Sequence, residues 1–232
     1  DFFHPNTTQF WSEGLSELNT ILDFDGIWQD MNEPSTDYAE SFLKGEVNST
    51  LNPLFNEYEN IPYIPGNGNI DLVSRAISVN AYNYHNEKNE KLMRLYNTRP
   101  LNSLMQSKIT YDYLKTIDKR PFILSRASVP GLGRYSIHWL GDNYSTYESM
   151  QLSLSGIFNF QMFGFAMMGA DICGFNDNAY DELCARWHVL GAFYTFSRNH
   201  SNRDTRMQEP FSIGDITLNA TRKALMVRYS LI

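Results

Sequence analysis

The chain has 232 residues, of which 42% are hydrophobic and 14% aromatic, enough to build one sizeable core. Its net charge is -7 and its Lys and Arg residues form no basic run, which argues against a nucleic-acid-binding surface. Its most apolar run, residues 152–170, is interrupted by Ser, Asn and Gln side chains, so it favours a buried helix and strand over a membrane span.

Strand and helix patterns alternate along the chain. Apolar residues at helical spacing predict helices over residues 11–22, 100–114, 147–158 and 181–190. Buried strand patterns fall at residues 24–30, 121–126, 136–141, 163–170 and 195–198. This alternation predicts an α/β fold with a parallel sheet, and polar residues at the strand ends favour a TIM-type barrel over a doubly wound sheet.

The predicted barrel is incomplete. Residues 35–69 are rich in Asn, Pro and Gly with no clear period, which indicates a loop excursion. The other patterns make about five strand–helix units, whereas a closed (β/α)8 barrel needs about eight. The chain also opens at Asp1 without an initiator methionine, and its last apolar pattern continues to Ile232. We therefore expect residues 1–232 to form one partial barrel domain with an open sheet edge.

Charged or polar side chains stand at the carboxyl ends of the predicted strands. These residues are Asp30, Arg126, Asp142, Asp171 and His200. In a parallel barrel the carboxyl ends of the strands converge on one pocket, so these side chains are candidates for a common site. From the residues alone, other interpretations stay open: Asp30 can cap the next turn, Arg126 can form a structural salt bridge, and His200 can be a satisfied polar residue.

A series of motifs follows the same order as these strands. The chain contains DFFHPNTTQFW at its start, WQDMNE over residues 28–33, RPFILSRASVPGLGRYSIHWLGDN over 120–143, MMGADICGF over 167–175 and ELCARWHVLGAFYTFSRNH over 182–200. Together they resemble glycoside hydrolase family 31, the retaining α-glucosidases. The resemblance implies strands four to eight of that family's catalytic barrel, with the earlier strands, the N-terminal β-sandwich and the C-terminal β domains outside this chain.

The resemblance implies a retaining, exo-acting α-glucosidase that releases terminal α-1,4-linked glucose, and also α-1,6-linked glucose, through a covalent glucosyl-enzyme. Retention needs two carboxyl groups about 5–5.5 Å apart, one to attack the anomeric carbon and one to protonate the leaving oxygen. We assign the nucleophile to Asp30 and the general acid/base to Asp142, which apolar neighbours and nearby negative charge should keep protonated. Glu33 is expected to orient the nucleophile rather than react.

The same resemblance implies a set of residues that hold the sugar. They are Trp28, Met31, Arg126, Trp139, Asp171, Phe175 and His200. Without the resemblance, the four apolar members would be assigned to the core. Two other functions stay open: a barrel that binds carbohydrate without catalysis, against which the presence of both acids counts, and a family relative with another specificity, such as an α-xylosidase or a transglucosidase.

Cys173 and Cys184 lie near each other in the sequence without a CxxC motif or a His cluster, which argues against a zinc site. A short-loop disulfide is the other interpretation, and the resemblance favours it.

The chain contains Asn-x-Ser/Thr triplets, which fit a secretory route. They begin at Asn6, Asn48, Asn143, Asn199 and Asn219. The resemblance implies an extracellular, lysosomal or vacuolar protein. No nucleotide or metal motif is complete, so we expect no cofactor and an α-glucoside, maltooligosaccharide or starch as the partner.

Overall fold

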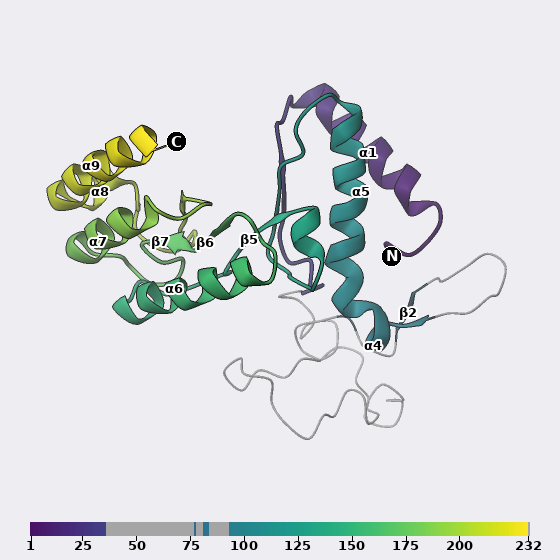
Figure 1. Ribbon diagram of the computed structural model, residues 1–232, viewed down its shortest axis with the longest axis horizontal. Coiled ribbons are helices and arrows are strands. Elements are labelled where there is room, and N and C mark those ends of the chain that lie inside the picture. Colours follow the sequence, from purple (N-terminus) through teal and green to yellow (C-terminus); the bar gives the residue numbers. More distant parts are fainter. Residues whose placement is uncertain (36–76, 78–80, 84–92, 232) are drawn as a thin grey trace, which may run out of the picture. The chain divides into compact units, whose positions relative to one another are not determined.

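The structure is a computed structural model that describes residues 1–35, 77, 81–83 and 93–231 (Figure 1). Apart from Ser35, the expected loop excursion over residues 35–69 lies outside the described residues. The chain divides into two compact units, Asp1–Tyr135 and Ser136–Ile232. Within the described ranges, no helix has both the length and the apolar character that crossing a membrane requires.

The first unit is built on two parallel strands, β1 (Ile27–Gln29) and β4 (Ile123–Ser125), with Trp28 opposite Leu124. Helix α1 (Thr7–Ile21) precedes β1, and α5 (Asn102–Thr116) precedes β4. The two helices lie side by side (Figure 1). Their apolar faces and the strands enclose a core of Leu15, Tyr113, Leu114 and Ile123.

Short elements complete the described part of this unit. They are the antiparallel pair β2 (Tyr82–Asn83) and β3 (Met93–Arg94), helix α4 (Leu95–Thr98), and the 3-10 turns η1 (Arg99–Leu101) and η2 (Leu132–Arg134). The turn before η2 depends on Gly131, whose φ of 90° is a conformation that side chains with a Cβ rarely adopt.

The second unit contains two parallel strand pairs, each joined by a helical crossover. Strands β5 (Ile137–Trp139) and β6 (Met168–Gly169) flank α6 (Tyr147–Met162). Strands β7 (Asp171–Ile172) and β8 (Arg198–Asn199) flank α7 (Asp181–Gly191). Helices α8 (Pro210–Ile213) and α9 (Asp215–Leu231) follow, and α9 packs along α7. The alternation of strand and helix confirms the predicted α/β class.

The predicted strand over residues 163–170 is wrong in its first half. Helix α6 extends to Met162, and the Phe163 N–H still donates to the Asn159 carbonyl at 3.1 Å. Gly164, with a φ of 95°, then ends the helix, and the Phe165 N–H turns back to the Phe160 carbonyl. The sheet therefore begins again only at β6.

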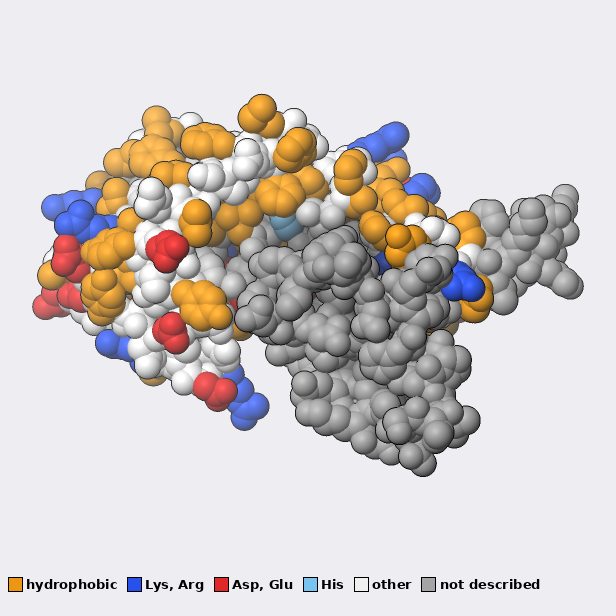
Figure 2. Space-filling model, turned by 90° about the horizontal axis from the view of Figure 1, so that it is seen from below, with side chains coloured by type: hydrophobic (Ala, Val, Ile, Leu, Met, Phe, Trp, Pro, Cys, Tyr) orange, Lys and Arg blue, Asp and Glu red, His pale blue; other side chains and the backbone are white. Residues whose placement is uncertain are grey.

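Large hydrophobic side chains lie exposed on several helices of both units. Examples with more than half of their surface exposed are Phe10, Ile21, Phe158, Met162, Phe211, Met226 and Tyr229. Figure 2 shows hydrophobic side chains, in orange, spread over one face of the described surface. Exposed apolar surface of this kind is typical of surfaces that contact further protein.

Candidate active site

The loop after β1 carries Asp30, Asn32 and Glu33, and Asn32 fixes it from inside. Asn32 is buried; its Nδ2 donates to Ser125 Oγ at 2.9 Å, and its Oδ1 accepts from the Ala127 N–H at 2.9 Å. These bonds tie the loop after β1 to the loop after β4. The neighbouring strand therefore determines where the two acids of the loop lie.

Arg126, the residue that follows β4, joins these two acids. Its Nε donates to Glu33 Oε1 at 2.9 Å and its Nη2 donates to Glu33 Oε2 at 3.0 Å, a bidentate pair. Its Nη1 lies 3.3 Å from Asp30 Oδ1, which also accepts from the Met31 N–H at 2.8 Å. Because Glu33 fixes the plane of the guanidinium, the positive charge beside Asp30 has a fixed position.

The side chains of β1 alternate as a strand predicts. Trp28 is 49% exposed and Asp30 is exposed, whereas Gln29 between them is buried. The Gln29 amide donates to Thr110 Oγ1 at 2.8 Å and accepts from Ser107 Oγ at 2.6 Å, both on α5. The buried face thus anchors the strand to its helix, and the opposite face presents Trp28 and the acid.

In the second unit, Asp142 is exposed just beyond β5, and its neighbour Asn143 secures the loop. Asn143 Nδ2 donates to the Asp171 carbonyl at 3.0 Å, and its Oδ1 accepts from the Phe175 N–H at 2.9 Å. The Asn143 carbonyl also accepts from the Asn176 N–H at 2.8 Å. The loop that carries Asp142 is therefore held by the backbone of the segment after β6.

Asp171 is fully buried and forms an ion pair with Arg198, whose Nη2 donates to Asp171 Oδ1 at 2.6 Å. The Arg198 guanidinium lies over the Trp139 ring, 5.1 Å from its centre. Trp139 is only 1% exposed, so in this unit it contributes mainly as packing beneath the ion pair. Charge compensation explains how a carboxylate is accommodated at this depth.

Phe175 and His200 come together in this unit. Their rings stack with centres 5.1 Å apart and planes inclined by 30°. Beside His200 lies a polar pocket of about 270 Å³, lined by Asn199, His200, Ser201, Gln208, Glu209 and Pro210. A stacked aromatic surface with polar groups beside it suits the apolar faces and hydroxyl edges of a sugar.

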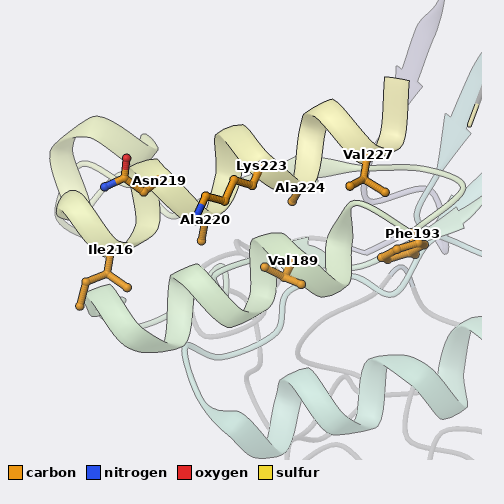
Figure 3. A pocket seen from close by; sticks show the side chains of 8 residues that line it. All are labelled: Val189, Phe193, Ile216, Asn219, Ala220, Lys223, Ala224 and Val227. Atoms are coloured by element: carbon orange, nitrogen blue, oxygen red, sulfur yellow. The ribbon is translucent and has the colours of Figure 1, made fainter. Parts of the chain in front are cut away.

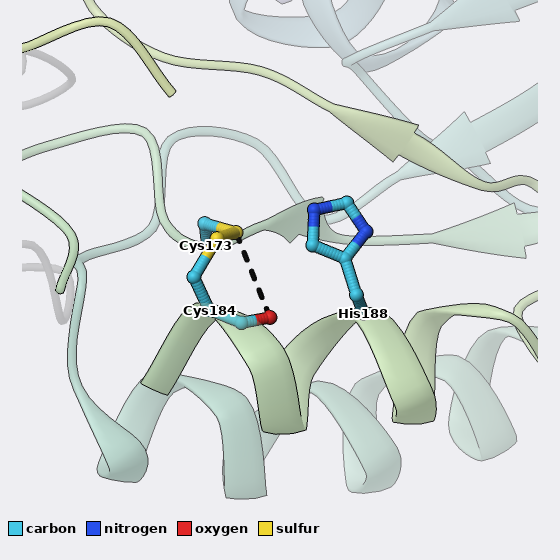
Figure 4. A group of neighbouring side chains, drawn as sticks. All are labelled: Cys173, Cys184 and His188. Carbon is cyan, nitrogen blue, oxygen red and sulfur yellow. Dashed lines mark hydrogen bonds between the residues drawn. A yellow bond between two sulfur atoms is a disulfide. The ribbon is translucent and has the colours of Figure 1, made fainter. Parts of the chain in front are cut away.

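Cys173 and Cys184 form a disulfide, which confirms the bond that the family resemblance implied (Figure 4). His188 lies next to it, with its ring and both sulfurs within 4.8 Å of one another. Because the disulfide leaves no thiolate, this cluster does not have the donors of a zinc site. Burial lowers the pKa of His188 to about 4, and His188 Nε2 lies 3.0 Å from Asn199 Nδ2, so the neutral imidazole is the acceptor.

A second cavity lies between α7 and α9 and has a different character (Figure 3). Its volume is about 580 Å³, and its lining consists of Val189, Phe193, Ile216, Asn219, Ala220, Lys223, Ala224 and Val227. Among the residues that the structure describes, no carboxylate lines it, so these residues do not supply the acid pair that glycoside hydrolysis needs. The candidate acids therefore stay on the loops after β1 and β5, one in each unit.

Three residues that shape these loops were not expected from the sequence: Gln29, Arg198 and Gln208. Gln29 had a recognisable signal, since it is a polar residue between two outward-facing positions of a strand. Arg198 also had one, because it ends the predicted strand over residues 195–198. Gln208 had none, because most of its contacts are with main-chain carbonyls.

Comparison with known proteins identifies the family of this chain. Residues 1–232 match the sequence model of the glycosyl hydrolases family 31 TIM-barrel domain. The chain is 39% identical to the lysosomal acid alpha-glucosidase of Tetrahymena pyriformis, with all of this chain and 28% of that protein covered. It is 38% identical to the lysosomal alpha-glucosidase of Rattus norvegicus, of which it covers 23%.

Among solved structures, the glucosidase II alpha subunit bound to Glc1Man2 is similar to this chain. The TM-score is 0.74 at 26% sequence identity, with 100% of this chain and 21% of that chain covered. The chain therefore spans roughly a quarter of the length of the two lysosomal relatives named above. On the match over its whole length, the chain belongs to glycoside hydrolase family 31 and has the sequence of that family's TIM-barrel domain.

Proposed function

We propose that the protein containing this chain is a retaining, exo-acting α-glucosidase with Asp30 as nucleophile and Asp142 as general acid/base. Its substrates are terminal α-1,4-linked glucose units of maltooligosaccharides or starch, and α-1,6-linked units as well. The contact of Asp30 with Arg126 at the end of β1 is the observation that supports this proposal most strongly. The named α-glucosidase relatives support the substrate class.

Asp30 would attack the anomeric carbon. The Asp30 side chain is 39% exposed, so a substrate could approach it. Among the described residues, both contacts of this carboxylate use Oδ1, which receives Arg126 and the Met31 N–H. We therefore assign the attack to Oδ2. The fixed guanidinium orients the carboxylate for this attack.

Asp142 would protonate the leaving oxygen and then, as a carboxylate, take a proton from the water that releases glucose. The position of its loop depends on Asn143, whose amide joins two points of the neighbouring segment. A general acid must keep its place through both half-reactions, and this anchoring supports that role. Retention further requires Asp142 to lie about 5–5.5 Å from Asp30 with substrate bound.

The stacked Phe175–His200 pair would hold the glucose unit, with Trp28 and Met31 beside the nucleophile. Arg126 would complete the sugar site. Asp171 and Trp139, which are 0% and 1% exposed, would support that site through Arg198 rather than touch the sugar. The disulfide, together with the Asn-x-Ser/Thr triplets, supports a secreted or lysosomal protein.

The test is the configuration of the first product. The full-length protein is mixed with nitrophenyl α-glucoside and with maltose, and the reaction is followed by proton NMR before mutarotation. We expect α-glucose to appear first. Initial β-glucose would exclude a retaining mechanism, and the absence of turnover would favour a carbohydrate-binding barrel without catalysis.

A further inference from the structure

Gln208 lies between β8 and α8 and is 3% exposed. Its Nε2 is within hydrogen-bond distance of the Ile172 carbonyl (3.2 Å), the Gly174 carbonyl (3.0 Å) and the His200 carbonyl (3.2 Å). It also lies 3.1 Å from Asn199 Oδ1. Because main-chain carbonyls only accept, the NH2 end of the amide must face them.

The contact with Asn199 is reciprocal. Asn199 Nδ2 donates to the main-chain carbonyl of Gln208 at 2.9 Å and also contacts His188 Nε2 at 3.0 Å. Two amide side chains therefore join the segment after β7, the segment after β8 and the start of α8. Buried amides that bind several carbonyls restrict the relative movement of the segments they connect.

The two segments that Gln208 joins are those that carry Phe175 and His200. Gly174, whose carbonyl Gln208 binds, has a φ of 94°, and a Cβ there would clash with the backbone of Ser145. The Gly174 segment thus packs directly on the loop that follows Asp142. A series of contacts therefore runs from the Gln208 amide through the segments of the stacked ring pair to the loop that carries the general acid.

We propose that Gln208 is a positioning residue for the sugar site: its amide sets the separation of the Phe175 and His200 segments, so that the rings stack in the arrangement that binds glucose. This inference rests on the proposed function. Gln208 itself would touch neither the sugar nor the reacting atoms. Misplacement of binding groups by about 1 Å can cost about 100-fold in rate, which sets the scale of the effect.

The experiment compares Gln208→Met with wild type in the full-length protein. Met has a similar length but cannot donate to any of the carbonyls within reach of the Gln208 NH2, which has two hydrogens to share among them. We expect kcat/KM for nitrophenyl α-glucoside to fall about 10- to 100-fold. The Kd of an iminosugar glucose mimic, measured by calorimetry on folded protein, should rise at least about tenfold. Loss of folded protein alone would lower the number of binding sites but leave that Kd unchanged.

Thr217→Val provides the matched control. Thr217 is also buried in this unit, and its hydroxyl donates to Asp181 at 2.7 Å, away from the ring pair. We expect it to lower the melting temperature without changing the iminosugar Kd. A double-mutant cycle with Phe175→Ala adds a second readout, since Gln208→Met should have little further effect once the ring is absent.

A folded Gln208→Met protein with wild-type Kd and kcat/KM would overturn the inference, and so would full additivity with Phe175→Ala. If Gln208→Met does not fold, Gln208→Asn, which keeps an amide on a shorter side chain, is tested in the same way; wild-type Kd would again overturn it. Failure of the proposed function is distinguishable, because wild-type protein would then show no turnover.

Discussion

The loops after β1 and β5 secure their acids by different means. At Asp30 the carboxylate itself is held, by Arg126 and by the neighbouring backbone N–H. At Asp142 the preceding strand and Asn143 hold the loop, through hydrogen bonds to the backbone of residues 171–176. The first arrangement depends on charge and the second on backbone packing. Substitutions of charged neighbours should therefore affect the two acids unequally.

The largest effect is expected from the acids themselves. Asp30→Ala should lower kcat/KM about 10⁴-fold or more on every substrate, because the nucleophile is absent. Asp142→Ala should lower it about 10²- to 10⁴-fold on maltose and much less on nitrophenyl glucoside, whose leaving group needs little protonation. Steady-state kinetics on both substrates separate the two roles.

Azide sharpens this distinction. Azide should partly restore the activity of Asp142→Ala, because it attacks the glucosyl-enzyme in place of water. The product is then the α-glucosyl azide. Isolation of the β-azide from that variant would reverse the assignment of nucleophile and acid/base, since inversion is the result of a missing nucleophile.

An intermediate effect is expected from Arg126→Lys. A single ammonium cannot span Glu33 and Asp30 as the guanidinium fork does, so we predict a fall of about 100-fold in kcat/KM. Glu33→Gln keeps the shape of the side chain but removes its negative charge, and it should lower kcat/KM about tenfold. The control is Lys108→Gln, which breaks an exposed ion pair with Asp112 and should change neither activity nor stability measurably. Equal effects from Arg126→Lys and Lys108→Gln would contradict a role for the guanidinium fork at Asp30.

The last effect concerns stability in the second unit and should leave activity at neutral pH unchanged. Burial lowers the pKa of His188 to about 4, below its ordinary value of 6.5. The unfolded chain therefore binds a proton more readily, and stability is complete above pH 6.5 and is lost as pH falls toward 4. The loss is about 3 kcal/mol. His188→Gln, which keeps an acceptor for Asn199, should reduce the fall in melting temperature between pH 7 and pH 4.5; an unchanged fall would show that other groups cause it.

Much of the fold was predictable because strand and helix differ in their apolar period. The runs at residues 121–126 and 136–141 are apolar and bounded by turns, and both contain a strand. Helix α9 was not predicted, since side chains such as Met226, 73% exposed, lie on its outer face and blur the pattern. The strand expected from residue 163 failed because Gly164 controls where α6 ends.

Within the candidate site, the proximity of Asp30 and Arg126 follows from neighbouring parallel strands whose ends meet. The same reasoning could have found the partner of Asp171, because β7 and β8 are neighbouring parallel strands on which Asp171 lies opposite Arg198. The sequence prediction ended its strand at Arg198 but gave that residue no role. Gln208 was beyond sequence reasoning, since three of its four acceptors are main-chain carbonyls that carry no sequence signature.

Covalent trapping tests the central assignment most directly. The full-length protein is incubated with a 5-fluoro-glucosyl fluoride, which slows hydrolysis of the glucosyl-enzyme, and the labelled peptide is sequenced by mass spectrometry. We predict one fluoroglucosyl group on Asp30. A label on Glu33 or Asp142 would contradict the assignment of the nucleophile.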